Sequence, residues 1–168
     1  MREHWGEKTN FYHFFFFQAQ AFLAAALSIT FIALLKNQSP NISLYEYLGF
    51  AIWILGIIGE TIADKQLANF RANSKNKGKT CRVGLWHYSR HPNYFFEWTL
   101  WLSYSIMAIG TLLWWIPALN AIIMFIFITK LTGIPYTELQ AIKSRGEDYK
   151  RYQETTSAFI PWTPKKIK

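Results

Sequence analysis

The residue types most capable of chemistry gather in one short segment, Arg90-His91-Pro92-Asn93-Tyr94, which Glu97 follows closely. These ionisable and polar groups stand at the start of a long apolar stretch, where they are costly and often mark functional sites. Pro92 suits the first turn of a helix. Because arginine and helix N-termini both bind anions, the segment predicts a site for an anionic ligand. The alternative role for Arg90 is contact with lipid headgroups.

Two polar pairs point to the same region. Glu60 and Asp64 are four residues apart, as are Asn93 and Glu97, so each pair lies on one face of its helix. Both pairs flank one basic loop, which ends at Arg82. We therefore expect a polar pocket at this end of the two helices, with capping or snorkelling as the alternative role for Asp64 and Glu97.

A third group of candidates lies further along the chain. Tyr149 and Tyr152 fall in a polar stretch, residues 138–152, whose pattern predicts an exposed helix. The two rings then belong to the face of an amphipathic helix. Alternatively, they fold back over the pocket and stack on a planar cofactor. The sequence leaves both alternatives open.

Several classes of function are not expected from the composition. The single cysteine, Cys81, excludes an internal disulfide. His87 and His91 are four apart, but apart from Glu97 no further metal ligand stands near them, so we expect no metal site. The net charge of +8 comes from basic residues beside apolar spans, which is not the pattern of a nucleic-acid-binding module.

The apolar segments that must position these residues predict an all-α membrane bundle. Hydrophobic residues make up 51% of the 168 residues and aromatics 18%, more than a soluble core needs. The first apolar segment is too long for a signal peptide and is expected to be retained. We predict one membrane domain over residues 1–168, with about four transmembrane helices and a helical C-terminal tail: 11–35, 44–62, 95–115, 116–131 and the tail 132–168.

The basic residues predict the orientation of this bundle. With four spans and both termini on one side, every Lys and Arg except Lys36 falls on that side. Loops rich in Lys and Arg stay in the cytoplasm. Both termini, the tail and the loop 65–82 are therefore expected to be cytoplasmic, and the lipid bilayer is the expected partner.

Three ordered motifs resemble the membrane reductases related to steroid 5α-reductase, in particular their bacterial branch of uncharacterised proteins. The first motif is Gly84-Leu85-Trp86 followed by Tyr88 to Phe95 and Glu97. The second is Ala63-Asp64-Lys65-Gln66-Leu67, and the third is Thr156-Ser157-Ala158-Phe159-Ile160-Pro161-Trp162. The likeness covers residues 1 to about 164 and implies a bacterial inner-membrane location.

The resemblance implies a cofactor and a substrate class. It places NADPH at the cytoplasmic helix ends, with Asp64, Asn93, Tyr94 and Glu97 on the nicotinamide and ribose, and with Arg90, His91 and the basic loop towards the phosphates. The cofactor would reduce a lipophilic, steroid-like enone. The proton donor is not identified, and the oligomeric state is left open.

A shorter likeness supports a different reaction. Arg90-His91-Pro92 with Tyr94 is similar to isoprenylcysteine carboxyl methyltransferases, which implies S-adenosylmethionine as the alternative cofactor. In that case Arg90 and His91 would bind the methionine carboxylate.

Two departures from the reductases favour a third possibility, a non-catalytic membrane scaffold. Phe96 stands where the family usually has Gly, and we expect its ring to face lipid or to adapt at the rim of the pocket. Relatives also carry further spans before the segment matching residues 1–6, so the chain is expected to be shortened at its N-terminus.

Overall fold

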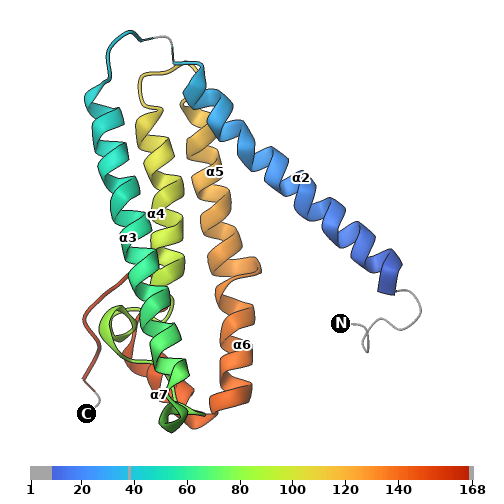
Figure 1. The fold of residues 1–168 in the computed structure, drawn as a ribbon, viewed down its shortest axis with the longest axis vertical. Coiled ribbons are helices and arrows are strands. Elements are labelled where there is room, and N and C mark those ends of the chain that lie inside the picture. The colour runs from blue at the N-terminus through green and yellow to red at the C-terminus, as the bar shows by residue number, and fades with distance from the viewer. Residues whose placement is uncertain (1–8, 38, 167–168) are drawn as a thin grey trace.

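The computed structural model describes residues 9–37 and 39–166, and in these ranges the chain forms helices and no strand. The all-α prediction is therefore confirmed for this part of the chain (Figure 1). In chain order the helices are α2 (Thr9–Leu35), α3 (Leu44–Ala72), η2 (Ser74–Asn76), η3 (Gly84–His87), α4 (Pro92–Met107), α5 (Trp115–Ile126), the π-helical η4 (Phe127–Leu131), α6 (Ile134–Arg145) and α7 (Glu147–Thr155).

The ends of these helices follow local sequence signals. Ser43 and Glu46 form a capping box at the start of α3, in which each side chain accepts a hydrogen bond from the other residue's backbone N–H. Pro92 opens α4, where its missing N–H costs nothing. Gly146 separates α6 from α7 with a φ of +55°, which a glycine adopts without strain.

Helices α3 and α4 approach each other closely through glycines of α3. A Cβ atom built on Gly59 would lie 2.3 Å from Cδ1 of Phe96, and one on Gly56 would lie 2.5 Å from Cδ2 of Leu100. Gly56 and Gly59 therefore allow the backbone of α3 to lie close to α4. The ring of Phe96, which we expected to face lipid or to adapt at the rim of the pocket, is half-buried and occupies the space that Gly59 leaves open on α3.

Three helices are long and apolar enough to cross a membrane: Thr9–Leu35, Leu44–Ala72 and the continuous run Trp115–Arg145. The chain thus has the properties of an integral membrane protein. Helix α4 has 16 residues, about 24 Å, which is less than a hydrocarbon core of about 30 Å. The predicted span 95–115 therefore differs from the structure, where the turn over residues 108–114 contains Gly110 at a φ of +91°. A count of four spans remains a prediction.

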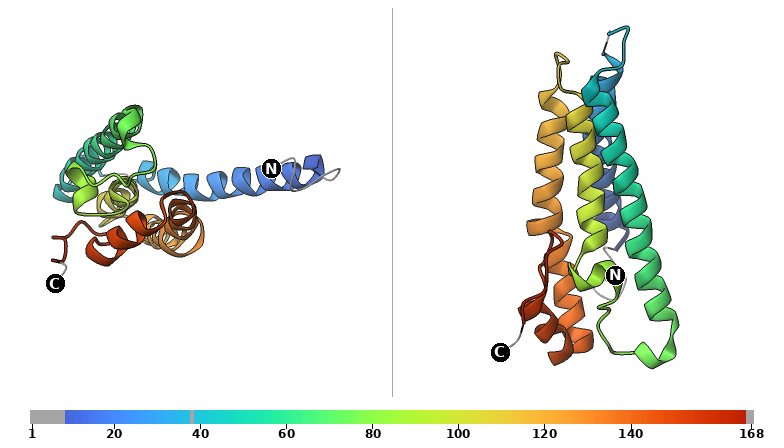
Figure 2. Two further views of the ribbon diagram at one scale, coloured as in Figure 1. Left: turned by 90° about the horizontal axis from the view of Figure 1, so that it is seen from below. Right: turned by 90° about the vertical axis from the view of Figure 1, so that its left-hand side faces the viewer.

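Helix α2 diverges from the other helices (Figures 1 and 2). Its C-terminal half is attached to α5, where Asn120 Nδ2 donates to Thr30 Oγ1 at 2.6 Å and to the Leu27 carbonyl at 3.3 Å. Phe31 also stacks edge-on against Tyr104 of α4. Towards its N-terminal end the helix stands apart from the bundle.

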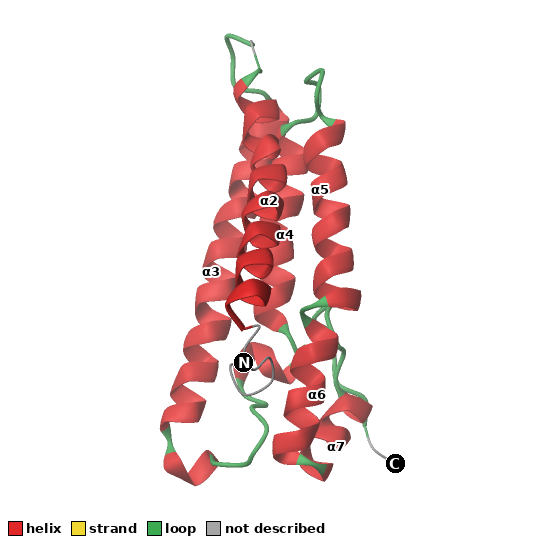
Figure 3. Cartoon of the chain, turned by 90° about the vertical axis from the view of Figure 1, so that its right-hand side faces the viewer, coloured by secondary structure: helices red, strands yellow, loops and turns green. Residues whose placement is uncertain are grey.

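Segments from distant parts of the sequence meet at the end of the bundle opposite the α2–α3 loop (Figure 3). Helices α6 and α7 lie there beside η3 and the residues that follow α7. Arg90 N donates to the Ser157 carbonyl at 2.8 Å, and Trp162 N donates to the Tyr88 carbonyl at 2.9 Å. The C-terminal segment is thereby strapped onto the loop that precedes α4.

The predicted exposed helix over residues 138–152 is wrong in two respects. Gly146 divides this stretch into α6 and α7, and the two helices fold back on each other. Tyr149 and Tyr152 are buried, with 3% and 2% of their surface exposed. Which side of a membrane this part of the chain faces stays a prediction.

Candidate functional site

A cavity of about 270 Å³ lies where α3, α4, α6 and α7 meet the loop before α4. Its walls come from five segments, which belong to three parts of the sequence: α3, the loop before α4 with α4 itself, and α6 with α7. We call it the central cavity, and its wall residues are Asp64, Leu67, Arg71, Thr80, Cys81, Trp86, Arg90, His91, Asn93, Tyr94, Thr137, Ala141, Arg145, Tyr149 and Tyr152.

Seven of the ten residues proposed from the sequence belong to this wall, namely Asp64, Arg90, His91, Asn93, Tyr94, Tyr149 and Tyr152. Glu60, Arg82 and Glu97 do not. The Glu97 carboxyl group lies close enough to Glu60 and Asp64 to interact with them electrostatically, at the packed contact between α3 and α4. Glu60, Asp64 and Glu97 therefore form an acidic group beside the central cavity. Of the three, Asp64 belongs to the cavity wall.

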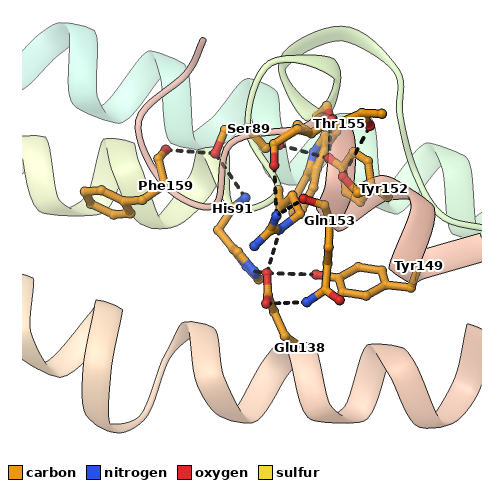
Figure 4. A network of polar contacts seen from close by, with 11 residues as sticks. Ser89, His91, Glu138, Tyr149, Tyr152, Gln153, Thr155 and Phe159 are labelled. Carbon is orange, nitrogen blue, oxygen red and sulfur yellow. Dashed lines mark hydrogen bonds and ion pairs between the residues drawn. The ribbon is translucent and has the colours of Figure 1, made fainter. Parts of the chain in front are cut away.

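Glu138 of α6 organises the polar side of the central cavity (Figure 4). Its Oε1 accepts hydrogen bonds from Arg90 Nε at 2.7 Å, from His91 Nε2 at 3.3 Å and from the Tyr149 hydroxyl at 3.4 Å. Its Oε2 accepts from Gln153 Nε2 at 2.7 Å. One carboxylate thus links the start of α4 to α6 and α7.

Arg90 is largely committed to this network. Besides the ion pair with Glu138, its Nη1 donates to the carbonyls of Gln153 at 2.9 Å and Thr156 at 2.8 Å. Three of its five N–H donors are therefore used, and only 11% of its side chain is exposed. Arg90 holds the C-terminal segment in place, and its Nη2 group has no protein acceptor in the described part of the chain.

His91 and Tyr94 form a stacked pair at the first turn of α4. Their rings lie 5.4 Å apart at an interplanar angle of 7°. The Tyr94 hydroxyl lies 3.2 Å from Thr137 Oγ1, which itself donates to the Gly133 carbonyl, so Tyr94 is the donor. The pair therefore has a defined orientation between α4 and α6.

Tyr149 and Tyr152 close the cavity from α7. The Tyr152 hydroxyl lies within hydrogen-bonding distance of the carbonyls of Trp86 and Ser89, with 3.0 Å to the latter. Burial raises the pKa of both phenols, and the charge of Glu138 raises that of Tyr149 further. Both side chains are consequently neutral hydrogen-bond donors at physiological pH.

Asn93 carries an acceptor without a protein partner. Its Nδ2 donates to Asp64 Oδ1 at 3.1 Å, which joins α4 to α3 across the cavity. Its Oδ1 is buried and has no hydrogen-bond partner among the described residues. A buried carbonyl oxygen left in this state is costly, so the site suits a ligand that brings an N–H or O–H donor.

Arg82 lies outside the wall of the central cavity but contacts residues of α7 that position it. Its Nη2 contacts Asp148 Oδ1 at 2.9 Å, and its guanidinium lies 5.5 Å from the centre of the Tyr152 ring. Asp148 also accepts from the Thr80 N–H at 2.7 Å. Partial burial raises the pKa of Asp148, but the hydrogen bond from the Thr80 N–H and the charge of Arg82 outweigh it and hold this pKa below its usual value.

A second depression, of about 580 Å³, continues from the central cavity. We call it the basic groove, and the two share Leu67, Arg71, Cys81 and Arg145 in their walls. Arg71, Arg145, Lys77 and Lys79 line it, and in the described part of the chain none of them forms an ion pair. The remaining wall residues are Phe70, Asn73, Ser74, Asn76, Gly78 and Ser144.

The sequence reasoning missed Glu138, Gln153 and Arg145. One signal for the first was present, since Glu138 is the only acidic residue between Glu97 and Glu147. An isolated acid in a basic stretch needs a partner when it is buried. No comparable signal marks Gln153, whose role depends on the way α7 folds back.

The long apolar helices and the polar cavity at one end of the bundle are the features of a helical membrane protein. The chain belongs to the DUF1295 family, described as proteins of unknown function, whose model matches residues 1–156. The resemblance to the 5α-reductase-like proteins is thus confirmed at the level of the family.

Two curated relatives carry different activities in their names. Over 70 residues the chain is 34% identical to a probable O-methyltransferase of Ustilaginoidea virens, and over 73 residues it is 37% identical to a very-long-chain enoyl-CoA reductase of Dictyostelium discoideum. These matches cover 42% and 44% of this chain, but only 24% of each relative. The matched part is thus about a quarter of either relative's length. No solved structure gives a significant match.

Proposed function

We propose that the protein is an NADPH-dependent reductase that acts on a lipophilic enone, with the cofactor in the central cavity and the basic groove. The family, the enoyl-CoA reductase among its relatives and the polar cavity beneath apolar helices support this proposal. NADPH would supply the hydride, which is the difficult step of such a reduction.

The observation that carries the proposal is the continuity of the cavity with the basic groove. Four cations around one groove repel one another and favour an anionic ligand. NADPH carries a diphosphate and a ribose phosphate, whereas S-adenosylmethionine carries no phosphate. The unpaired state of Arg71, Arg145, Lys77 and Lys79 therefore favours the phosphorylated dinucleotide.

The dimensions and donor set also fit this cofactor. The central cavity alone, about 270 Å³, lies just below the common range for small-molecule sites of roughly 300–1,000 Å³, and the adjoining groove of about 580 Å³ extends it into that range. Asn93 Oδ1 would accept an N–H of the bound cofactor. Arg71 and Arg145 stand at the junction of the two spaces and would hold phosphate oxygens.

A binding experiment tests the proposal directly. Purified full-length chain in mild detergent is titrated with NADPH, NADH and S-adenosylmethionine. We expect NADPH to bind more tightly than NADH, because only NADPH has the additional phosphate. Arg71→Gln should weaken NADPH binding about tenfold, the value of a hydrogen bond to a charged group.

Arg151 provides the matched control for this variant. It is an exposed arginine on α7 that belongs to the wall of neither the cavity nor the groove. Arg151→Gln should leave the affinity for NADPH unchanged. Equal losses in the two variants would show that the basic groove does not bind the cofactor, and equal affinities for NADPH and NADH would show that the groove does not bind the ribose phosphate.

The second candidate function is a methyl transfer from S-adenosylmethionine. The name of the Ustilaginoidea virens relative favours it, as does the small volume of the central cavity considered alone. Binding of S-adenosylmethionine together with no binding of NADPH in the same titration would establish this alternative. The scaffold hypothesis loses one support, because Phe96 packs on Gly59 and is absent from the cavity wall.

A further inference from the structure

Thr80 is a buried residue of the central cavity wall whose hydroxyl has no partner. Only 6% of its surface is exposed, and its Oγ1 forms no hydrogen bond with the described residues. A buried hydroxyl in this state is unfavourable, because folding has removed the water that it bonded in the unfolded chain. Such a group in a cavity wall indicates a ligand that completes its hydrogen bonding.

The backbone of Thr80 is held in place independently of its hydroxyl. Its N–H donates to Asp148 Oδ2 at 2.7 Å, and Oδ1 of the same carboxylate accepts from Arg82 Nη2 at 2.9 Å. Helix α7, which carries Asp148, therefore fixes this part of the loop between η2 and η3. Since the hydroxyl adds nothing to these contacts, a structural role does not account for it.

Two cationic side chains lie close to this part of the loop. Arg71 and Arg145 belong to the same wall as Thr80, and an arginine side chain has no acceptor. The guanidinium carbon of Arg145 lies 5.0 Å from the centre of the Tyr149 ring. Burial raises the pKa of the adjacent Cys81 thiol, and Arg71 and Arg145 are close enough to lower it in part. A ligand group that meets the hydroxyl and both guanidiniums is therefore an anionic acceptor.

We infer that the Thr80 hydroxyl donates a hydrogen bond to the diphosphate of the bound cofactor, whose charge Arg71 and Arg145 neutralise. This role rests on the proposed function, in which the cofactor occupies both the central cavity and the basic groove. Thr80 lines the cavity but not the groove, whereas Lys77 and Lys79 line the groove but not the cavity. The diphosphate then lies where the two spaces meet, and the ribose phosphate lies further out, at the lysines.

A diphosphate suits this position better than a carboxylate does. Its oxygens are spread over two phosphorus atoms, so a hydroxyl and two guanidiniums can bind it at once. The carboxylate of S-adenosylmethionine offers two oxygens, and no second anionic group follows it. It would leave Lys77 and Lys79 without an anionic partner.

Thr80→Val tests this role, because it replaces the hydroxyl by a methyl group of the same shape. Purified full-length chain in mild detergent is titrated with NADPH and with ADP-ribose, which has the diphosphate but neither the nicotinamide nor the ribose phosphate. Both affinities should fall about tenfold, the value of a hydrogen bond to a charged group. Thr80→Ser keeps the hydroxyl and should retain both. The affinity for S-adenosylmethionine, which has no phosphate, should not change.

The stability of the unliganded chain separates ligand binding from a structural role. Thr80→Val should leave the melting temperature unchanged or raise it, because no hydrogen bond within the chain is lost. Thr99→Val is the matched control, since the Thr99 hydroxyl donates to the Phe95 carbonyl of its own helix at 2.8 Å and lies outside both walls. This control should bind ADP-ribose as the unaltered chain does. A lower melting temperature for Thr80→Val with unchanged affinities would assign the hydroxyl to the fold and overturn the inference.

The same titrations distinguish this role from the proposed function. Binding of NADPH that Thr80→Val does not weaken would contradict the role of Thr80 and leave the reductase proposal in place. Binding of ADP-ribose that Thr80→Val weakens, without any binding of NADPH, would support the diphosphate site and contradict the reductase. If neither compound binds, or if Thr80→Val weakens the binding of S-adenosylmethionine equally, the diphosphate assignment is wrong.

Discussion

At the scale of single residues, Glu138 explains more of the site than any residue chosen from the sequence. It binds Arg90, His91, Tyr149 and Gln153 at once, and both members of its ion pair with Arg90 are largely shielded from water. A charge in such surroundings is tolerated because its partner and hydrogen bonds are present. The pair therefore positions the first turn of α4 relative to α6 and α7.

Replacing this carboxylate should destabilise the fold. Glu138→Gln keeps the shape but removes the charge opposite Arg90, and we expect the free energy of unfolding to fall by about 1.5–3 kcal/mol, the usual value of a hydrogen bond to a charged group. Denaturant unfolding in mild detergent measures it. Glu147→Gln is the control, since Glu147 is exposed and its ion pair, with Lys150, is exposed as well. If Glu147→Gln lowered the free energy of unfolding as much as Glu138→Gln, the burial of the Glu138–Arg90 pair would not be the cause of the loss.

At the scale of elements, the contact between α3 and α4 depends on large side chains of α4 that pack where α3 has glycine and no side chain. Phe96 fills the space above Gly59, and Leu100 does the same above Gly56. This fit keeps Asp64 and Asn93 within hydrogen-bonding distance across the two helices. Phe96, where we expected a departure from the family pattern, thus belongs to the packing of α4 on α3 and not to the wall of the central cavity.

A double-mutant cycle tests this packing, because the effect of Gly59→Ala on stability should have opposite signs with and without the Phe96 ring. Gly59→Ala should destabilise the unaltered chain by about 1–3 kcal/mol, because the new Cβ would overlap the Phe96 ring. In a Phe96→Ala background the same substitution should stabilise the chain by up to about 1 kcal/mol through helix propensity. Thermal unfolding of the four proteins gives both values. The same sign in both backgrounds would contradict the packing described for Phe96.

The break between α6 and α7 is a second element whose geometry can be tested. Gly146 has a φ of +55° and a ψ of −127°, a conformation that disfavours any side chain. Gly146→Ala should therefore lower the free energy of unfolding by about 1–2 kcal/mol and weaken ligand binding, because α7 carries Tyr149 and Tyr152. Lys143→Ala, three residues earlier at an exposed position outside both walls, should have a smaller effect on both. Unchanged ligand affinity in the glycine variant would show that α7 keeps its place without this turn.

At the scale of the whole molecule, the two ends of the bundle have different characters. Helix α3 has 29 residues, about 43 Å, and so exceeds a hydrocarbon core of about 30 Å. Its last turns, with Arg71 and the basic groove, can therefore stand in water while its first half is in lipid. A water-soluble anionic ligand and a lipid-soluble one could approach the central cavity from different phases.

The orientation of this long axis remains a prediction with a clear test. Lys and Arg concentrate at the end that holds η2, which predicts a cytoplasmic location for that end. A reporter fused at Asn76 should report the cytoplasm, and one at Ser39 should report the opposite side. The reverse result would remove a cytoplasmic nucleotide from consideration as the ligand.

Sequence reasoning succeeded where the determinants were local or periodic. Pro92 marked the start of α4, and the spacing of the two polar pairs indicated that Asp64 and Asn93 belong to one region, where they form a hydrogen bond. It failed where distant parts of the chain decide. Glu138 and Arg90 are 48 residues apart, and nothing in the periodicity of either segment indicates their contact. For Phe96, the hydrophobic pattern could not distinguish a neighbouring glycine from lipid.

The strap of the C-terminal segment over the loop before α4 has a consequence for biosynthesis. Arg90 and Ser89 are made well before their acceptors, the carbonyls of Thr156, Ser157 and Phe159. While the ribosome is still adding α5 and α6, the arginine has neither its carboxylate nor its carbonyl partners. The pocket therefore matures only after the apolar helices have been delivered to the bilayer, and an arrested nascent chain that ends before α7 should be inserted but unable to retain a ligand.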